Sequence, residues 1–369
     1  MMDLSRISVV LPSLDPDEKL HTVINGLLEV GFTHIILVND GSKPENLHYF
    51  LEEAAAHPEI TLLHHPVNRG KGAALKTAFQ FFLDNRPDGV GIVTVYGDGQ
   101  HHRLDTKACA AHLLETGRLT LGVRDFNQKD VPARSRFGNK ITSAVFKIFV
   151  GLTLSDTQTG LRAIPRQELP GLLDVEGDRF EYETNMLLAL KKNRIPFDEV
   201  KIRTLYIEDN RTSHFHPVRD SWRIYKLILA HFFRYTLVSL TSALLDNCLF
   251  ALLSRLLLGV LNGISLTAAA TVGARVISSL FNFFLNKQVV FHSTMATGKA
   301  LLRYYTLAVP QMLTQLLLTQ GVYALLQIPD SATGIRTLIY ALVMGTLYIV
   351  SFMIQQRWVF ASGKNNPHG

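Results

Sequence analysis

The sequence is poor in cysteine throughout and poor in acidic residues in its second half. Its 369 residues include only Cys109 and Cys248, which excludes a disulfide framework and a zinc site built from clustered cysteines. From Arg234 onward there are two acidic side chains and nine Lys or Arg, whereas the first 233 residues carry 29 acidic and 28 basic ones. The net charge of +6 therefore comes from an acid-poor C-terminal part, and it does not indicate a nucleic-acid partner.

The N-terminal stretch also lacks the layout of a signal peptide. MMDLSRISVVLP has no charged segment followed by a long apolar one, and it runs directly into an expected strand. We therefore expect the first half of the chain to lie in a reducing compartment, most simply the cytoplasm. The length of the chain predicts two or three domains.

The first 220 residues alternate strand-like and helix-like segments. Short continuous apolar runs are typical of strands covered on both faces, and the segments between them have helical spacing. This pattern predicts a Rossmann-like, doubly wound parallel sheet, whose ligands bind at the carboxyl ends of the strands. The polar loops SLDPDE, NDGS, NRGKG and YGDGQHH follow the expected strands and should converge at that edge. The strands are expected at 7–12, 34–42, 60–65 and 90–99, and the helices at 17–31, 44–57 and 71–85.

The second half of the chain predicts membrane helices. Four apolar stretches each have the roughly 20 residues that cross a bilayer core. An amphipathic, basic segment at 217–234 precedes them, and we expect it to lie in the membrane interface as a linker, with an ordinary surface helix as the alternative. The expected spans are 235–258, 266–286, 304–327 and 335–356.

The basic residues between and after the spans predict an orientation. The middle loop carries Lys287, Lys299 and Arg303, and the tail carries Arg357 and Lys364. The positive-inside rule then places the first domain, the middle loop and both termini in the cytoplasm, as in a multi-pass protein of the cytoplasmic (inner) membrane. The expected domains are 1–216, the linker 217–234, the membrane domain 235–362 and a cytoplasmic tail at 363–369.

Two ionisable residues, Asp246 and Arg275, lie at membrane depth. Each is 12 residues from a basic residue at the cytoplasmic end of its span, so both should lie about 18 Å from that face. Ionisable groups inside a membrane are costly and are usually paired or functional. We predict that these two pair, either as a structural contact or as a site for a lipid headgroup.

The ends of two spans repeat weakly. FNFFLNKQVVF at 281–291 and VSFMIQQRWVF at 350–360 align with a shift of 69 residues. The repeat suggests two related pairs of helices in the membrane domain. The alternative is that both segments are generic span ends rich in aromatic residues, which favour the membrane interface.

Seven segments in fixed order carry a family resemblance. With them, residues 5–220 resemble an inverting family 2 glycosyltransferase with a GT-A fold, and are most similar to the dolichol-phosphate mannose synthase and polyprenyl-phosphate glycosyltransferase branch. Residues 231–362 resemble the GtrA-like four-span domain, an all-α domain proposed to bind or move lipid-linked sugars. The seven segments are VVLPSLDPDEKL, ILVNDGS, NRGKGAALKTAF, YGDGQHH, SDTQTGLRAI, RFEYETNML and SHFHPVRD, and the second resemblance rests on FRYTLVSLTSALLDNCLFALL and FNFFLNKQVVF.

The resemblance implies a nucleotide-sugar site along the strand ends. The loop NRGKG would bring the backbone of Gly70 close to a phosphate at a helix N-terminus, and Lys71 would add a positive charge, with a plain helix start as the alternative. The family often has Asn-Glu after the first strand, where this chain has Asp15-Pro16-Asp17-Glu18. The implied donor-binding residues are Pro12, Leu14, Asp15, Asp17, Asp40, Gly70, Lys71, Tyr96, Gly97 and Asp98.

The loop VTVYGDGQHH implies a metal site with one acid fewer than usual. The branch usually has Asp-x-Asp-x-Gln at this place, and here Tyr96 replaces the first acid while Asp98 and Gln100 remain. Carboxylate and amide oxygens suit Mg²⁺ or Mn²⁺, which would complete its shell with diphosphate oxygens and water. We expect Asp98 and Gln100 to form a metal site that is weak until the donor binds.

The remaining motifs imply catalytic and acceptor residues. Within FEYE only one acid should face the site, and we favour Glu181 over Glu183. A lipid phosphate is already ionised near neutral pH, so the acceptor needs cations more than a base, although a solvated basic loop is the alternative for the arginines. The expected catalytic residues are Asp98, Asp156, Gln158, Arg162 and Glu181, and the expected acceptor-phosphate residues are Arg124, Arg134, Arg136 and His214.

These motifs together predict a membrane enzyme that transfers a sugar from a nucleotide-sugar donor to polyprenyl phosphate at the cytoplasmic membrane face. Its expected cofactor is Mg²⁺ or Mn²⁺, no nucleic acid is expected to bind, and four-span modules commonly form homo-oligomers. One alternative is another acceptor, such as a diacylglycerol or a growing glycan. A second alternative, favoured by Tyr96, is a catalytically silent sensor of sugar nucleotides or a lipid-carrier transporter.

Overall fold

The computed structural model describes residues 3–126, 128, 131, 133–203, 217–258, 260, 261, 263–329 and 331–361. It divides into two compact units, the N-terminal unit (Met1–Ile228) and the C-terminal unit (Leu229–Gly369). The boundary lies inside one continuous helix, α8 (Pro217–Leu257). The predicted linker and the start of the first predicted span are therefore parts of the same helix.

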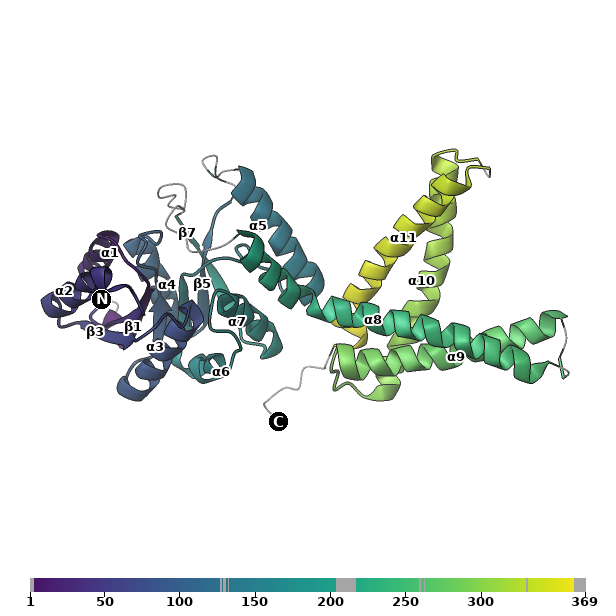
Figure 1. Ribbon diagram of the computed structural model, residues 1–369, viewed down its shortest axis with the longest axis horizontal. Coiled ribbons are helices and arrows are strands. Elements are labelled where there is room, and N and C mark those ends of the chain that lie inside the picture. The colour runs from purple at the N-terminus through teal and green to yellow at the C-terminus, as the bar shows by residue number, and fades with distance from the viewer. Residues whose placement is uncertain are drawn as a thin grey trace. The chain divides into compact units, whose positions relative to one another are not determined.

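The N-terminal unit is built on one seven-stranded sheet with the strand order β3-β2-β1-β4-β6-β5-β7 (Figure 1). The four predicted strands are present and parallel, but β6 runs antiparallel to both of its neighbours. The wholly parallel sheet that the sequence predicted is wrong at this strand. The connection that leaves β5 at its carboxyl end returns to the same edge, so β6 must run back. The strands are β1 (Ile7–Ser13), β2 (Ile35–Asp40), β3 (Ile60–His65), β4 (Gly91–Thr94), β5 (Leu119–Arg124), β6 (Arg162–Pro165) and β7 (Phe197–Ile202).

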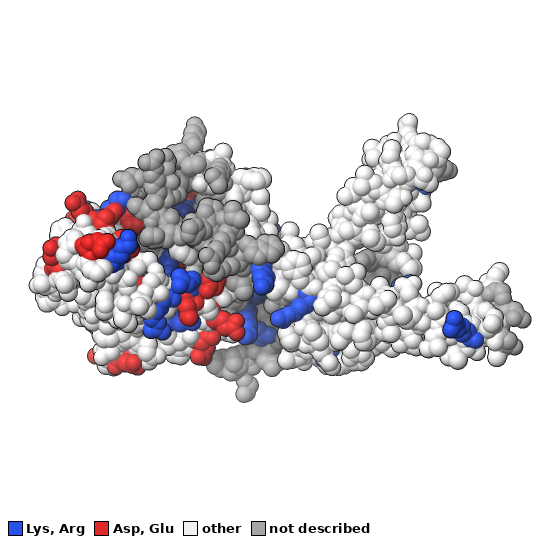
Figure 2. Space-filling view, viewed as in Figure 1, with Lys and Arg blue, Asp and Glu red and all other residues white. Residues whose placement is uncertain are grey.

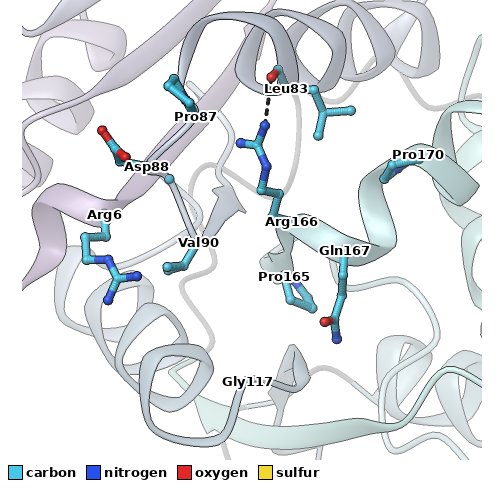
Figure 3. Close-up of a pocket in the computed structure, with 11 residues that line it drawn as sticks. Arg6, Leu83, Pro87, Asp88, Val90, Gly117, Pro165, Arg166, Gln167 and Pro170 are labelled. Carbon is cyan, nitrogen blue, oxygen red and sulfur yellow. Dashed lines mark hydrogen bonds between the residues drawn. The ribbon is translucent and has the colours of Figure 1, made fainter.

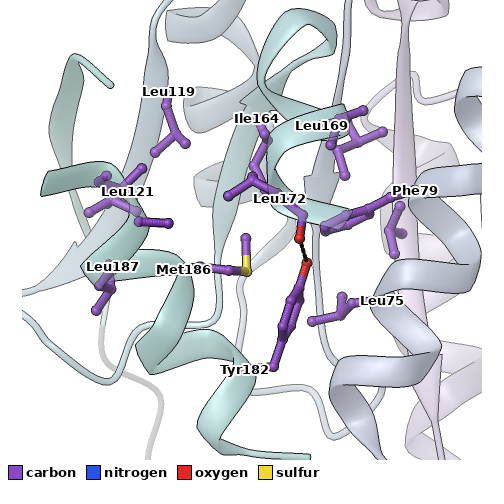
Figure 4. Close-up of a cluster of buried hydrophobic side chains, with 14 of the residues drawn as sticks. Leu75, Phe79, Leu119, Leu121, Ile164, Leu169, Leu172, Tyr182, Met186 and Leu187 are labelled. Atoms are coloured by element: carbon purple, nitrogen blue, oxygen red, sulfur yellow. Dashed lines mark hydrogen bonds between the residues drawn. The ribbon is translucent and has the colours of Figure 1, made fainter. Parts of the chain in front are cut away.

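Side chains of the strands alternate between two hydrophobic cores, one on each face of the sheet. In β1, Val10 enters one core while Val9 and Leu11 enter the other, as the two-residue period of a strand requires. Burial on both faces explains why these strands read as continuous apolar runs. Figure 4 shows the first core, in which the Tyr182 hydroxyl donates to the Leu172 carbonyl oxygen at 2.7 Å.

Helices cover both faces of this sheet (Figure 1). Side chains of α3, α6 and α7 pack in the first core, and side chains of α1, α2 and α4 pack in the second. A π-helical turn at Phe146–Val150 follows α5 and adds Phe146 to the first core. The helices are α1 (Lys19–Glu29), α2 (Leu47–Ala56), α3 (Lys71–Asn85), α4 (Arg103–Thr116), α5 (Ala133–Val145), α6 (Leu169–Leu173) and α7 (Glu181–Lys192).

The polar loops that follow the parallel strands meet at one edge of the sheet. After β1, the amide of Asp15 donates to Ser42 Oγ in the loop after β2, at 2.8 Å. In the loop after β3, the amide of Gly70 donates to Asp40 Oδ2 at the end of β2, also at 2.8 Å. Because β4 is parallel to β1, its following loop (95–102) opens at the same edge. The predicted convergence of these loops is confirmed.

In the C-terminal unit, long helices lie at the places of the four predicted spans, but the predicted count of four membrane spans is not confirmed. Within the described part of the chain, three stretches are long and apolar enough to cross a membrane. Helix α10, which corresponds to the third predicted span, is not one of them, because Pro310, Gln311 and Gln315 lower its mean hydropathy. The three stretches are Phe232–Leu257, Ile264–Val290 and Thr333–Val359, and the helices after α8 are α9 (Gly263–Leu285), α10 (Thr297–Leu325) and α11 (Thr333–Ile354).

Many apolar side chains of this unit point outward. Ile264 is 90% exposed and Leu317 is 70% exposed, and similar residues recur on all four helices. On the face that Figure 2 shows, the described surface of this unit has few charged side chains, whereas acidic and basic residues are mixed over the N-terminal unit. An exposed apolar surface of this extent is typical of a membrane domain.

The repeated span ends share an irregular backbone as well as a sequence pattern. A π-helical turn covers Asn286–Val290, and a second one covers Gln355–Val359, 69 residues later. Each turn opens with an amide side chain that is 0% or 5% exposed. The rings that follow the two turns, Phe291 and Phe360, stack with their centroids 5.1 Å apart. The shared burial and ring stacking favour two related helix pairs over generic span ends, whereas a π-helical turn also follows α5 and is not specific to the repeat.

Candidate active site

A surface hollow of the N-terminal unit lies at the edge of the sheet opposite the polar loops (Figure 3). Its lining includes Arg6, Val90 and Gly117, which come just before β1, β4 and β5. In this hollow, Arg166 donates to the carbonyl oxygen of Leu83 at 2.8 Å and so caps the C-terminal end of α3. None of the predicted site residues lines this hollow, so the candidate site is the edge where the loops meet.

Asp40 holds the glycine-rich loop after β3 from within the protein. Its Oδ1 accepts from the amide of Arg69 at 3.0 Å and from His65 Nδ1 at 2.7 Å, and its Oδ2 accepts from the amide of Gly70. Asp40 is 4% exposed, so it supports the loop rather than facing a ligand. Gly70 has φ of 103°, and a side chain there would lie 2.4 Å from the carbonyl oxygen of Asp178, so only glycine fits.

Two carboxylates of the loop after β1 accept hydrogen bonds from nearby parts of the protein. Asp15 has a positive φ of 47°, and its Oδ1 accepts from two donors of the loop after β2. Asp17 Oδ1 accepts from the amide of Lys19, the first residue of α1, at 3.0 Å. Pro12 is buried in β1, and Leu14 is half-buried. These predicted donor contacts therefore shape the loop edge, and of the four only Pro12 is fully enclosed.

Lys71, Tyr96 and Glu183 form a compact cluster at the centre of the edge. Lys71 Nζ lies 2.8 Å from Glu183 Oε2 and 3.3 Å from the centroid of the Tyr96 ring. The Tyr96 hydroxyl donates to the other carboxylate oxygen of Glu183. The side chains of Lys71 and Glu183 are 19% and 17% exposed, so this ion pair is largely shielded from water. The cluster joins the start of α3, the loop after β4 and the first turn of α7.

Burial and the neighbouring charges shift the pKa values of this cluster. Burial lowers the pKa of Lys71, and the Glu183 charge only partly opposes that shift. Burial also disfavours the ionised form of Glu183, but the charges of Lys71 and Arg162 outweigh it and lower the Glu183 pKa. Burial and the Glu183 charge both raise the pKa of Tyr96 well above its usual value. Tyr96 is therefore a neutral hydrogen-bond donor to an ionised Glu183.

Glu183 takes the position that the sequence favoured for Glu181. Helix α7 begins at Glu181, whose Oε1 accepts from the amide of Arg179, on the outer side of the helix start. Two residues further, Glu183 points to Lys71 and Tyr96. The preference for Glu181 is corrected, because a helix start turns residues two apart by about 200°. The sequence could not tell a helix start from a strand at FEYE.

The loop after β4 places Asp98 beside this cluster. Asp98 is half-buried, and its Oδ1 accepts from the backbone N–H of Gln100 at 3.1 Å. Burial raises the pKa of Asp98 above its usual value. The hydrogen bond from Gln100 and the nearby Lys71 charge oppose this shift only in part. Gly97 packs against the end of β1, since a side chain there would meet Ser13 at 3.3 Å. Burial and the charges of Lys71 and Arg124 lower the pKa of His101 to about 3.

The donor set suits a divalent cation that arrives with a diphosphate better than one held by the protein alone. In the described residues, no group of three or more His, Cys, Asp or Glu side chains could hold a metal ion. Asp98 offers one carboxylate and Gln100 one amide, both hard oxygen ligands. The Lys71 ammonium acts on Asp98 and would repel a lone cation. A bound diphosphate would relieve this repulsion and supply further oxygen ligands.

Two further predicted residues, Arg124 and Asp156, form a bidentate pair. Arg124 Nε lies 2.7 Å from Asp156 Oδ2, and Arg124 Nη2 lies 3.0 Å from Asp156 Oδ1. Asp156 is fully buried, whereas the Arg124 side chain is 28% exposed. The backbone N–H of Gln158 donates to Asp156 Oδ1 at 3.0 Å, and Gln158 is exposed. Asp156 therefore orients Arg124, because a carboxylate can accept two parallel hydrogen bonds from one guanidinium.

Arg162 lies inside the protein and not at a phosphate-facing surface. It is 3% exposed, its Nε donates to the Thr159 carbonyl oxygen at 3.1 Å, and its Nη1 donates to the Glu183 carbonyl oxygen at 2.9 Å. The predicted phosphate contact is corrected to an internal one. Arg162 links β6 to the first turn of α7 and so fixes where Glu183 stands.

The remaining predicted acceptor residues are only partly described. On α5, Arg136 is half-buried and its Nη2 donates to the Gln128 carbonyl oxygen at 2.8 Å. The side chain of Arg134 and all of His214 lie outside the described residues. Of the two whose side chains are described, Arg124 is joined to another predicted site residue, Asp156, and Arg136 to the backbone of Gln128. A role for these residues in acceptor binding stays a prediction.

In the C-terminal unit, the predicted ion pair between Asp246 and Arg275 is present. Arg275 Nη2 lies 3.2 Å from Asp246 Oδ2, and the Ser278 hydroxyl donates to Asp246 Oδ1 at 2.6 Å. The Arg275 side chain is 72% exposed and that of Asp246 is 19% exposed. Asn282, further along α9, makes another polar contact with α8, since its side-chain amide donates to Ser242 Oγ at 3.1 Å.

Comparisons with known proteins agree with this architecture. Residues 8–164 match the model for Glycosyl transferase family 2, and residues 234–360 match the model for the GtrA/DPMS transmembrane domain. These two matches define a glycosyltransferase joined to membrane helices. The chain therefore carries a glycosyltransferase family 2 domain, followed by a GtrA/DPMS transmembrane domain.

Several known proteins are similar to this chain. An uncharacterised protein of Methanocaldococcus jannaschii is 28% identical over 232 residues, which are 62% of this chain and 93% of that protein. The UDP-N-acetylglucosamine–dolichyl-phosphate N-acetylglucosaminyltransferase of Methanococcus voltae is 27% identical over 224 residues, 55% of this chain and 86% of that protein. The solved mannosyltransferase of Pyrobaculum calidifontis, in complex with GDP-Man and Mn²⁺, is 15% identical with a TM-score of 0.40, over 96% of this chain and 87% of that one.

Replacing Asp40 should loosen the glycine-rich loop. In Asp40→Ala, two backbone amides and the His65 ring lose their acceptor, so we expect a loss of about 2–4 kcal/mol of unfolding free energy. Thermal unfolding of the full chain in detergent measures it. Asp84→Ala, at an exposed position on α3, is the control and should change stability by less than about 0.5 kcal/mol. Equal effects of the two variants would contradict the supporting role of Asp40.

Charge reversal tests the pair between Asp246 and Arg275. Asp246→Arg places two cations side by side at membrane depth, and we expect most folded protein to be lost, as measured by recovery of a monodisperse peak in detergent. Combining it with Arg275→Asp should restore the peak, because the pair is rebuilt in the opposite sense. Arg255→Asp, an exposed position on the same helix as Asp246, is the control for a single reversal. A double variant no better than either single one would rule out the pairing.

Proposed function

We propose that this glycosyltransferase moves a sugar from a nucleotide-sugar donor to the phosphate of a polyprenyl lipid, with inversion at the anomeric carbon. The observation that carries this proposal is that Lys71, at the start of α3, and Asp98, in the loop after β4, lie together at the loop edge of the sheet, in a chain that continues into membrane helices. The Methanococcus voltae relative, whose name gives dolichyl phosphate as its acceptor, supports the lipid acceptor.

The proposed reaction needs positioning and charge stabilisation more than a catalytic base. An oxygen of the lipid phosphate attacks the anomeric carbon from the side opposite the leaving group. The bond between that carbon and the diphosphate breaks, and its electron pair leaves with the nucleoside diphosphate. Because the attacking oxygen is already ionised, no proton has to be removed. Lys71 meets the negative charge that develops on the diphosphate, in a site largely shielded from water.

A divalent cation, Mg²⁺ or Mn²⁺, would add charge stabilisation to the same leaving group. Asp98 and Gln100 would hold it, with the remaining ligands from diphosphate and water. Asp98 is half-buried next to Lys71, which supports binding of the cation together with the donor. Asp156 fixes Arg124 on the acceptor side, where the exposed part of that guanidinium can meet the lipid phosphate.

Helix α5 is proposed to bring the acceptor side to the bilayer. Phe137 is 67% exposed and Ile141 is 41% exposed on this helix, and Arg136 lies next to Phe137. Thr142 hydrogen-bonds Tyr225, at the start of α8, with 3.1 Å between their hydroxyl oxygens. Apolar side chains beside basic ones suit a segment in the membrane interface. The excess of basic residues in the middle loop and the tail supports a cytoplasmic position for the N-terminal unit.

A second candidate is a catalytically silent binder of nucleotide sugars, which Tyr96 favours because it takes the place of an acid. A transferase with another acceptor is the third. In the silent binder, donor would bind without turnover. In the other transferase, labelled sugar would reach a diacylglycerol or a glycan instead of polyprenyl phosphate. One assay with several donors and acceptors separates these candidates.

Transfer is tested directly with radiolabelled donors. Full-length protein in membranes should move label from one of UDP-glucose, UDP-N-acetylglucosamine or GDP-mannose to polyprenyl phosphate, and EDTA should lower the rate. Asp98→Asn should lower it by about 100-fold, because the metal loses its carboxylate, while Asp84→Asn should match the wild type. No lipid product from any donor would rule out the proposed reaction.

Metal binding should depend on the nucleotide. We expect Mn²⁺ to bind the full chain at least about tenfold more tightly when UDP or GDP is present, since the diphosphate supplies ligands that the protein lacks. Tyr96→Asp adds a second carboxylate and should strengthen Mn²⁺ binding without nucleotide. Electron paramagnetic resonance of free Mn²⁺ measures both. If Tyr96→Asp leaves metal binding unchanged, Tyr96 does not occupy a ligand position.

A further inference from the structure

The place of the missing acid in the metal loop is filled by a connected set of side chains. Tyr96 stands where the related loops have an acid, and its ring lies under the ammonium of Lys71, with 3.3 Å between Nζ and the ring centroid. Its hydroxyl reaches across to Glu183, which pairs with the same ammonium at 2.8 Å. The substitution therefore does not leave a gap in the site. The ring of Tyr96 contacts the Lys71 ammonium, so a cation lies at the place of the acid.

The surroundings restrict the ammonium on several sides. A tyrosine ring attracts a cation over its face, and the attraction is stronger when water is excluded. The Phe180 ring lies 5.8 Å from Nζ on another side. Arg162 donates to the backbone carbonyl oxygen of Glu183 at 2.9 Å, which fixes the position from which the Glu183 side chain reaches Lys71. A lysine side chain is ordinarily flexible, and here three groups limit its position.

We propose that Glu183 and Tyr96 position the Lys71 ammonium as a built-in cation for the donor diphosphate, which replaces part of the charge stabilisation that a second metal-binding acid would support. This inference rests on the proposed function, because it needs a nucleoside diphosphate at this edge. Glu183 and Tyr96 are positioning residues: they act on the diphosphate through Lys71. Binding of the diphosphate part of the nucleotide then has a component that needs no metal.

The component without metal is measured by comparing diphosphates with monophosphates. Full-length protein in detergent, with EDTA, is titrated calorimetrically with UDP, UMP, GDP and GMP. We expect the wild type to prefer one of the diphosphates over its monophosphate by about tenfold, the value of one charge-assisted contact. Lys71→Met should reduce this preference to within about twofold.

The matched control is Lys76→Met on the same helix. The Lys76 side chain is 22% exposed, close to the 19% of Lys71, and it also pairs with an acid, Asp178, at 3.2 Å. This variant removes the same charge five residues away and should keep the preference for the diphosphate. If Lys71→Met and Lys76→Met behave alike while nucleotide still binds, Lys71 is not the cation for the diphosphate and the inference fails.

In Glu183→Gln, the direction of the change in nucleotide binding distinguishes a positioning role from a purely electrostatic one. Removing a negative charge next to an anion site should, by electrostatics alone, strengthen binding of UDP or GDP. If Glu183 positions Lys71, the loss of its anchor should instead weaken the preference for the diphosphate by about three- to tenfold. Stronger or unchanged binding would show that Glu183 has only a structural role, and would overturn its part of the inference.

Tyr96→Phe keeps the ring and the net charge but removes the hydroxyl that binds Glu183. We expect a smaller weakening in the same direction, with thermal unfolding near that of the wild type, so this variant remains informative if Glu183→Gln fails to fold. If Tyr96→Phe keeps the preference for the diphosphate unchanged, the Tyr96 hydroxyl does not help to position Lys71. If neither UDP nor GDP binds the wild type, with Mn²⁺ or with EDTA, both the inference and the proposed nucleotide site are wrong. If UDP or GDP binds the wild type and Lys71→Met with the same preference for the diphosphate, only the inference is wrong.

Discussion

The ion pair between Lys71 and Glu183 connects the elements that form the site. Lys71 opens α3, Glu183 lies in the first turn of α7, and Tyr96, which contacts both, belongs to the loop after β4. A charge that is shielded from water is stable only with its partner in place, so the ion pair fixes the positions of the three elements relative to one another. Asp40 fixes the loop that leads to Lys71, and Arg162 fixes the helix turn that carries Glu183. The site therefore depends also on Asp40 and Arg162, two internal charged residues that no ligand needs to touch.

The C-terminal unit meets a different constraint, because its surroundings are apolar. Many of its leucine, isoleucine and valine side chains are exposed, and it contains only two of the 31 acidic residues of the chain. One of these, Asp246, is paired with Arg275 and also accepts from Ser278. An unpaired acid at that depth would be strongly unfavourable. The π-helical turns at Asn286–Val290 and Gln355–Val359 lie 69 residues apart, the same shift as the weak sequence repeat of this unit.

Much of the first fold could be predicted from local pattern. Helix α3 begins at Lys71 and ends at Asn85, as its spacing and flanking residues predicted, and the first four strands lie where the apolar runs placed them. The direction of β6 was not predictable, because a strand of four residues reads the same in either direction. The choice between Glu181 and Glu183 failed for a related reason. It depends on whether FEYE is helix or strand, and neighbouring elements decide that.

The sequence by itself determined the class of each unit, the edge of the sheet that carries the loops, and the residue types available there. These follow from periodicity, apolar length and charge, which are properties of short segments. Only the tertiary structure decided how those residues are used. It turned Asp40 and Arg162 inward and joined Asp156 to Arg124, and it placed Glu183 and not Glu181 against Lys71. Contacts between residues far apart in the chain set these outcomes, since each buried charge had to find a partner in space.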